Sequence, residues 1–229
     1  MSAKDRADRA DDLESRTTGR MRLGDYVRPP NETLASVLAA WRHPEAKAPP
    51  DAPARFGFMS KGEFFRVRVL TADDSDKLLD FMQDGLSDHS RELRFLTSVP
   101  QVRARVSAQL SQRDGYKRVG LITTTGEGPQ EVIVAMAEYA VLPDDEPPEV
   151  AIAVADDYQH RGIGTSLITA LATLSLAAGH QKWSGDVLHE NDPVFALLGE
   201  VGHVSVTDES GGVAHVEIDL DPAKVLVAH

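Results

Sequence analysis

The sequence predicts an α+β fold, with a mixed, mostly antiparallel central sheet of six to seven strands flanked by about four helices. The order of the expected elements is the first reason: one strand, then helices, three strands of antiparallel type, a helix, a strand, a short helix and two strands. The second reason is that strands and helices do not alternate throughout the chain, as they would in a doubly wound parallel fold. One long helix between two strands gives a single crossover near the middle.

The first 63 residues differ in texture from the rest of the chain. Residues 1–20 carry many charges and almost no apolar side chains, so we expect a flexible tail. Residues 21–63 are rich in proline and form an N-terminal extension with one short helical pattern at 32–42. Its apolar positions fit a helix that packs either on the main domain or on a partner, and the pattern leaves both open.

The main domain is expected to span residues 64–220. Phe65, Val67 and Val69 alternate with basic residues, which is typical of a half-buried strand. The following segment, Thr71-Ala-Asp-Asp74, looks like a capping box that begins a helix. A second helical stretch runs through Leu93, and a third has apolar residues at spacing four: Val102, Val106 and Leu110.

The second half of the domain supplies most of the strands. Residues 116–124 and 131–142 read as a hairpin around a turn rich in glycine. A strand that begins at Glu149 leads into a long amphipathic helix at 166–179. The remaining expected elements are a strand at 182–188, a short helix from Asp192, two strands at 204–206 and 213–220, and a C-terminal tail at 221–229.

Composition and charge limit the possible functions. The chain contains 41% hydrophobic residues, no apolar run long enough to span a membrane, and a charged N-terminus where a signal peptide would be apolar. We therefore expect a cytoplasmic protein that does not bind a membrane. The net charge of −12 argues against nucleic acid as a partner, and the lack of cysteine excludes disulfides and thiol nucleophiles.

The segment between the strand from Glu149 and the long helix has the properties of an anion site. It reads Gln159-His160-Arg161-Gly162-Ile163-Gly164-Thr165. The free N–H groups of a helix N-terminus attract phosphate, and glycines let a ligand approach the backbone. The spacing fits neither a dinucleotide fingerprint nor a P-loop. The alternative is that the glycines only make a tight turn.

This segment resembles the acyl-CoA signature of the GCN5-related N-acetyltransferase (GNAT) family, Gln/Arg-x-x-Gly-x-Gly/Ala. Three further matches are the upstream Ile152-Ala-Val154, the downstream strand Ser184-Gly-Asp-Val-Leu188, and Asn191 followed by Gly202. The resemblance covers about residues 64–220. Within the family it is closest to the bacterial protein-lysine acetyltransferases, which share a Glu-Val-Ala strand start and a segment similar to Ser90-Arg-Glu-Leu-Arg94-Phe95.

The resemblance implies a set of residues that bind acetyl-CoA, with no metal. The backbone of residues 159–165 would hold the pyrophosphate, and Arg161 could add a positive charge. The strand is expected to splay from the next one, with the pantetheine arm beside Ala153 and Val154. Asn191 matches a cofactor-contacting asparagine of the family, and it is also a good N-cap for the short helix.

The resemblance also implies direct attack of a primary amine on the thioester, with Glu149 as the general base that removes a proton from the amine. The expected acceptor is a protein lysine, and a small-molecule amine or a non-catalytic acyl-CoA-sensing module are the alternatives. The tyrosine that usually serves as general acid aligns with Leu198, and His203 replaces an aromatic residue. Tyr139 and Tyr158 are other candidates for the acid. The oligomeric state stays open.

Overall fold

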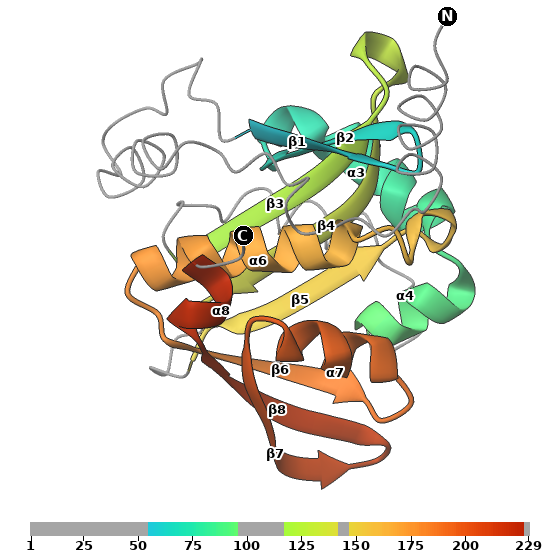
Figure 1. Ribbon diagram of the computed structural model, residues 1–229. Coiled ribbons are helices and arrows are strands. Elements are labelled where there is room, and N and C mark those ends of the chain that lie inside the picture. The colour runs from blue at the N-terminus through green and yellow to red at the C-terminus, as the bar shows by residue number, and fades with distance from the viewer. Residues whose placement is uncertain (1–54, 96–116, 142–146, 227–229) are drawn as a thin grey trace, which may run out of the picture.

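The computed structural model describes residues 55–95, 117–141 and 147–226. Within these residues a single eight-stranded sheet has the order β1-β2-β3-β4-β5-β6-β8-β7, and only the β5–β6 pair is parallel (Figure 1). The strands are β1 Arg55–Ser60, β2 Glu63–Val69, β3 Arg118–Thr125, β4 Val132–Ala140, β5 Glu149–Val154, β6 Lys182–Leu188, β7 Gly202–Ser210 and β8 Val213–Leu220. The predicted mixed, mostly antiparallel α+β sheet is confirmed.

Helices cover both faces of this sheet. The longest, α6, lies across one face, and its buried residues Leu167, Ile168 and Leu171 belong to the same core as the sheet residue Trp183 (Figure 1). A second, smaller core on the other face lies under α3 and η3. The helical elements are η2 Ala72–Asp74, α3 Ser75–Asp80, η3 Phe81–Gly85, α4 Asp88–Phe95, η4 Gly128–Gln130, η5 Asp156–Tyr158, α6 Ile163–Ala177, α7 Asp192–Gly199 and α8 Pro222–Leu226.

Two elements lie outside the predicted bounds of the domain. β1 pairs with β2 through a two-residue loop, Lys61-Gly62, in which both residues have positive φ, 49° and 80°. It adds one strand to the expected six or seven and lies before the expected start at Phe64. α8 lies in the predicted C-terminal tail. The predicted tail at 1–20, the helix at 32–42 and the helical pattern of Val102, Val106 and Leu110 fall outside the described residues.

The sheet divides where β5 meets β6. The two strands pair only at Glu149 and Ser184, and Figure 1 shows them diverging from that point. Ser184 fastens the joint, because its N–H donates to the carbonyl of Pro148 and its hydroxyl donates to the carbonyl of Pro147, each at 3.0 Å. Gly185 permits the close approach, since an added Cβ would lie 3.4 Å from the carbonyl oxygen of Val150. The predicted splay is therefore present.

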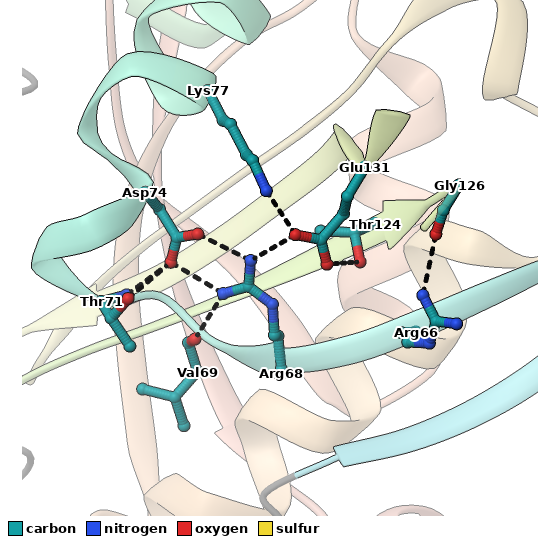
Figure 2. A network of polar contacts seen from close by, with 9 residues as sticks. All are labelled: Arg66, Arg68, Val69, Thr71, Asp74, Lys77, Thr124, Gly126 and Glu131. Atoms are coloured by element: carbon teal, nitrogen blue, oxygen red, sulfur yellow. Dashed lines mark hydrogen bonds and ion pairs between the residues drawn. The ribbon is translucent and has the colours of Figure 1, made fainter. Parts of the chain in front are cut away.

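A buried network of charges fixes the first helical segment to the sheet (Figure 2). The Arg68 guanidinium donates to both carboxylate oxygens of Asp74, at 2.7 and 2.6 Å, and also contacts Glu131 at 3.3 Å. Asp74 also accepts the backbone N–H of Thr71 at 2.8 Å, as expected for the predicted capping box. Lys77 of α3 donates to Glu131. The network thus joins β2, η2, α3 and the start of β4.

This network makes folding sensitive to acid. Burial alone would raise the pKa of Asp74, but hydrogen bonds from Arg68 and Thr71 hold it below its ordinary value of 3.8. Burial alone would likewise raise the pKa of Glu131, but the contacts with Lys77 and Arg68 hold it below its ordinary value of 4.5. The unfolded chain therefore takes up these protons more readily, so stability is present above the ordinary values and lost as the pH falls through the lowered ones. Urea unfolding midpoints should be flat from pH 7 to 5 and fall below about pH 4.

Candidate active site

A cavity of about 400 Å³ opens where β5 and β6 diverge. Its walls come from α4, β5, the loop before α6, β6 and α7. All of the predicted site residues except Arg161 and Ile163 line it: Glu149, Ala153, Val154, Gln159, His160, Gly162, Gly164, Thr165 and Asn191. The structure thus brings together residues that are up to 42 positions apart in the chain.

The loop formed by residues 159–165 presents unbonded backbone amides to the cavity. His160 and Gly162 have positive φ, 56° and 75°, and Gly162 is the N-cap of α6. The first backbone bond of the helix runs from the N–H of Ser166 to the carbonyl of Gly162. The N–H groups of Ile163, Gly164 and Thr165 therefore have no backbone partner among the described residues. This arrangement of successive amides at a helix N-terminus suits an anion.

The edge of β5 that faces the gap is also available. The N–H of Ala155 donates to Val134 of β4 at 2.9 Å. Since backbone direction alternates along a strand, Ala153 also points toward β4, whereas Ile152 and Val154 point toward the gap. The carbonyl of Val154 accepts the side chain of Gln159 at 3.2 Å. Ile152 and Val154 therefore offer backbone groups to a ligand, while Ala153 offers only its small side chain.

Asn191 is a buried polar residue whose side chain makes no hydrogen bond with a described residue. It is 6% exposed and lines the cavity. It is the N-cap of α7, but its side chain makes no capping bond, and only its carbonyl accepts from Val194 and Phe195. The side-chain amide forms no hydrogen bond with any described residue. Because Asn191 lines the cavity, its side-chain amide is available to a ligand there.

Arg161 and Ile163 point elsewhere. The guanidinium of Arg161 pairs with Glu63 at 2.9 Å and lies over the ring of Tyr158, 4.8 Å from its centre. The backbone carbonyl of Arg161 accepts the hydroxyl of Ser60 at 2.9 Å. Ile163 is buried in the core. The side chain of Arg161 thus fastens the 159–165 loop to the β1–β2 hairpin instead of facing the cavity.

Glu149 lies at the joint between β5 and β6, where the cavity begins. Its residue is exposed, and its carboxylate makes no hydrogen bond or ion pair with any residue that the structure describes. Asp186 of β6 also lines the cavity, and its carboxylate lies 2.7 Å from Nδ1 of His215. The cavity therefore holds carboxylates that a cationic group could approach.

The candidates for a general acid are distributed unevenly. Leu198, which aligns with the tyrosine of the family, is buried and lines the cavity, so no proton donor stands there. Tyr139 is fully buried against His180 and does not line the cavity. Tyr158 does line it, and burial followed by the charge of Glu63 raises the pKa of its hydroxyl. His203 is exposed at the start of β7.

α4 contributes the wall opposite β6, which the sequence identified only through the Ser90–Phe95 match. Ser90, Leu93 and Arg94 line the cavity. Arg94 donates to the buried Glu138 of β4 at 3.0 Å, and Arg118 lies 3.9 Å from the other carboxylate oxygen of Glu138. Within that sequence match, Ser90 is therefore a cavity residue, and Arg94 both lines the cavity and anchors α4 to β4.

The model of the acetyltransferase (GNAT) family matches residues 91–203, which include most of the residues that line the cavity, the 159–165 loop and Asn191. The GNAT domain of S. lividans PAT superimposes with a TM-score of 0.62 and 25% identity, covering 73% of this chain and 99% of that domain. Residues 91–203 of the chain are therefore similar to the GNAT family. Acetyltransferase Pat of Mycolicibacterium smegmatis is 38% identical over 74 residues, so the similarity extends to the Pat proteins, as the sequence predicted.

The likeness to GNAT proteins has a limited extent. The match to M. smegmatis Pat covers 32% of this chain and only 22% of that protein. A third GNAT protein, yncA of Salmonella typhimurium, solved with acetyl-CoA, has a TM-score of 0.52 and 15% identity, covering 69% of this chain and 94% of its own. No helix in the described part of this chain is long and apolar enough to cross a membrane.

Proposed function

We propose that this chain is an N-acetyltransferase that uses acetyl-CoA as its donor and a primary amine as its acceptor. The observation that carries the proposal is the side-chain amide of Asn191, which makes no hydrogen bond with a described residue and shares a cavity with the unbonded backbone amides of the 159–165 loop. A ligand that satisfies both must carry an anion at one end and polar groups along its length. Acetyl-CoA has this chemistry, and yncA was solved with it.

The residues of the cavity fit the parts of the donor. The N–H groups of Ile163, Gly164 and Thr165 would bind the pyrophosphate without a basic side chain. The gap-facing backbone of Ile152 and Val154 would pair with the pantetheine amides, as another strand would. Gly164 adds no side chain to this part of the cavity, where an added Cβ would contact a methyl group of Leu197 at 3.4 Å.

Glu149 is proposed as the general base. An amine attacks a thioester only when it is neutral, and a lysine ammonium has an ordinary pKa of about 10.4. The carboxylate of Glu149 takes a proton from the ammonium, directly or through water, and the amine nitrogen then bonds to the acetyl carbon as the carbon–sulfur bond breaks. Its place at the cavity mouth and its lack of a described partner support this role.

The departing sulfur needs little help. A thiol has an ordinary pKa of about 8.5, so a thiolate leaves and takes up a proton afterwards. This agrees with Leu198 at the position of the family tyrosine. The hydroxyl of Tyr158 in the cavity wall could donate a proton to this thiolate, although the Tyr158 ring contacts Arg161 and Phe65.

A protein lysine is the proposed acceptor. The support is the resemblance of the Ser90–Phe95 and Glu149 segments to the protein-lysine branch, the similarity to the Pat proteins, and two exposed carboxylates, Glu149 and Asp186, in the cavity wall. A small-molecule amine would meet the same carboxylates. Incubation of cell extract with radiolabelled acetyl-CoA, with and without the added protein, separates the two. Label above the control without added protein should appear in the acid-precipitated protein and not in the small-molecule fraction.

Leu198 favours one other function, that of a module which binds acyl-CoA without transferring the acyl group. Its buried, apolar side chain stands where the family places a proton donor. Calorimetry would support this function over ours if CoA binds while no amine in a panel of lysine peptides and polyamines becomes acetylated.

Donor binding is the first test of the proposal. Acetyl-CoA at 100 times its Kd should stabilise the folded protein by about 2.7 kcal/mol and raise its Tm, and Asn191→Ala should weaken binding by about 1 kcal/mol, roughly fivefold. Differential scanning fluorimetry and calorimetry measure both. Gln181→Ala removes an exposed side-chain amide outside the cavity and should change neither. No shift with any CoA thioester would refute the proposal.

A further inference from the structure

α4 forms a wall of the cavity, and few of its side chains with described burial are apolar. None of residues 88–94 is buried. A helix of eight residues is too short to be stable alone, and most helices in proteins are held by a packed apolar stripe. Polar contacts contribute to the position of α4, and they can be identified one by one.

The first turn of α4 is held by the carboxylate of Asp156. The N–H of Ser87 donates to one oxygen of Asp156, and the hydroxyls of Ser87 and Ser90 donate to the other, each at 2.9 Å. Ser87 in turn caps the helix, because its hydroxyl accepts the N–H of Ser90 at 3.1 Å. Burial alone would raise the pKa of Asp156, but the hydrogen bonds from Ser87 and Ser90 hold this pKa below its ordinary value and so favour the ionised carboxylate.

The far end of α4 is held separately. Arg94 donates to the buried Glu138 of β4, while Arg91 donates to the carbonyls of Gln83 and Leu86. These contacts connect α4 to the sheet and to η3. α4 also lies against β5, the strand that leads toward the 159–165 loop. Among the described residues, the hydrogen bonds between α4 with its cap Ser87 and the segment that joins β5 to this loop are those of Asp156.

Asp156 is placed to transmit a change in that loop. It begins η5, and its carbonyl accepts the N–H of Gln159, the first residue of the loop, at 3.2 Å. Its neighbour Ala155 is fixed to β4 through Val134. A ligand bound by the loop amides therefore restrains η5, and with it the carboxylate that holds α4.

We propose that Asp156 is a positioning residue that couples the donor-binding loop to α4, so that a bound CoA sets and stiffens the wall of the cavity that α4 forms. This inference rests on the proposed function. Asp156 does not touch the reacting atoms. It acts through Ser87 and Ser90, and its three hydrogen bonds link the segment before the 159–165 loop to α4.

Hydrogen–deuterium exchange of the full chain, with and without coenzyme A, tests the coupling without a known acceptor. In the wild type, CoA should slow exchange in residues 159–165 and, by about fivefold, in residues 88–95. In Asp156→Asn, CoA should still protect 159–165 but no longer protect 88–95, because the amide loses the charge and one acceptor. Asp157→Asn alters the exposed neighbour, which makes no described hydrogen bond, and should behave as the wild type.

The conservative pair at Ser90 separates coupling from a simple loss of structure. Ser90→Thr keeps the hydroxyl and should retain the CoA-dependent protection of α4, whereas Ser90→Ala should reduce it. Equal protection of 88–95 by CoA in the wild type and in Asp156→Asn would overturn the coupling and leave the proposed function standing. If CoA protects neither segment of the wild type, the proposed function fails and the coupling fails with it.

Discussion

Glu149→Gln is expected to lower the turnover number by roughly 100-fold or more, since a positioned general base contributes about 10²–10⁴ to the rate. The glutamine keeps the shape of the side chain but cannot accept the proton of the amine. Acetyl-CoA should bind nearly as tightly as before, because the predicted donor contacts come from the 159–165 loop, β5 and Asn191. Steady-state kinetics with a lysine peptide, paired with calorimetry of acetyl-CoA, measures the two effects separately.

Glu200→Gln provides the matched control for this prediction. Glu200 is exposed after α7 and does not line the cavity, so its substitution should leave turnover within about twofold of wild type. Equal turnover of Glu149→Gln and wild type would show that Glu149 is only an exposed residue at the start of a strand. A large rise in the acetyl-CoA Kd would instead place it among the donor contacts.

Asp74→Asn is expected to destabilise the fold by about 3 kcal/mol, within the range measured when one partner of a buried ion pair is removed. The side chain of Asp74 is 5% exposed, and its loss leaves the Arg68 guanidinium, 13% exposed, with the longer contacts to Glu131 and to the carbonyl of Val69, each at 3.3 Å. A loss of this size lowers the Tm of a domain of this length by about 6–12 °C. Chemical unfolding followed by circular dichroism gives the free energy directly.

The adjacent Asp73→Asn controls for charge at the same helix start. Asp73 is exposed and makes no hydrogen bond with a described residue, so we expect a change below about 0.5 kcal/mol. A similar loss in both variants would mean that the effect comes from the charge near the helix N-terminus, and the network in Figure 2 would then contribute little.

The part of the site that the sequence predicts well is local in the chain. Glycines at 162 and 164, a strand before them and an amphipathic helix after them specify the loop and its amides within about 20 residues. Asn191 was also found from its spacing, although its choice between capping and ligand binding needed the structure. Its side chain makes no cap bond, which the pattern Asn-Asp-Pro could not reveal.

The contacts that the sequence could not predict join distant positions. Ser90 and Asp156 are 66 residues apart, Arg94 and Glu138 are 44 apart, and Arg161 and Glu63 are 98 apart. In a one-dimensional pattern, charged residues of this kind look like solvated surface, so the sequence gives no signal for the contacts of Asp156. For Arg161, the neighbouring glycines suggested phosphate as a partner in place of Glu63. Only the packing of α4 and the β1–β2 hairpin assigns their partners.

The missed strand and helix had weaker local signals that were readable in hindsight. In β1 the residues Phe56 and Phe58 alternate with glycine and methionine before the Lys61-Gly62 turn, but the preceding prolines favoured an irregular extension. α8 begins at Pro222 just after Asp221, whose carboxylate accepts the N–H of Ala223 at 2.8 Å. Asp followed by Pro is a common helix start. However, α8 has only five residues, which is too short to give a helical pattern in the sequence.

The single pairing of Glu149 with Ser184 has a consequence for how the molecule comes apart. It divides the sheet into a five-stranded block, β1 to β5, and a three-stranded block, β6, β8 and β7, that share one rung of the ladder. A molecule lying in the gap would supply the absent rungs and tie the blocks together. Without it, the smaller block should be the first to detach under load, so pulling from the C-terminus would report ligand occupancy as a change in rupture force.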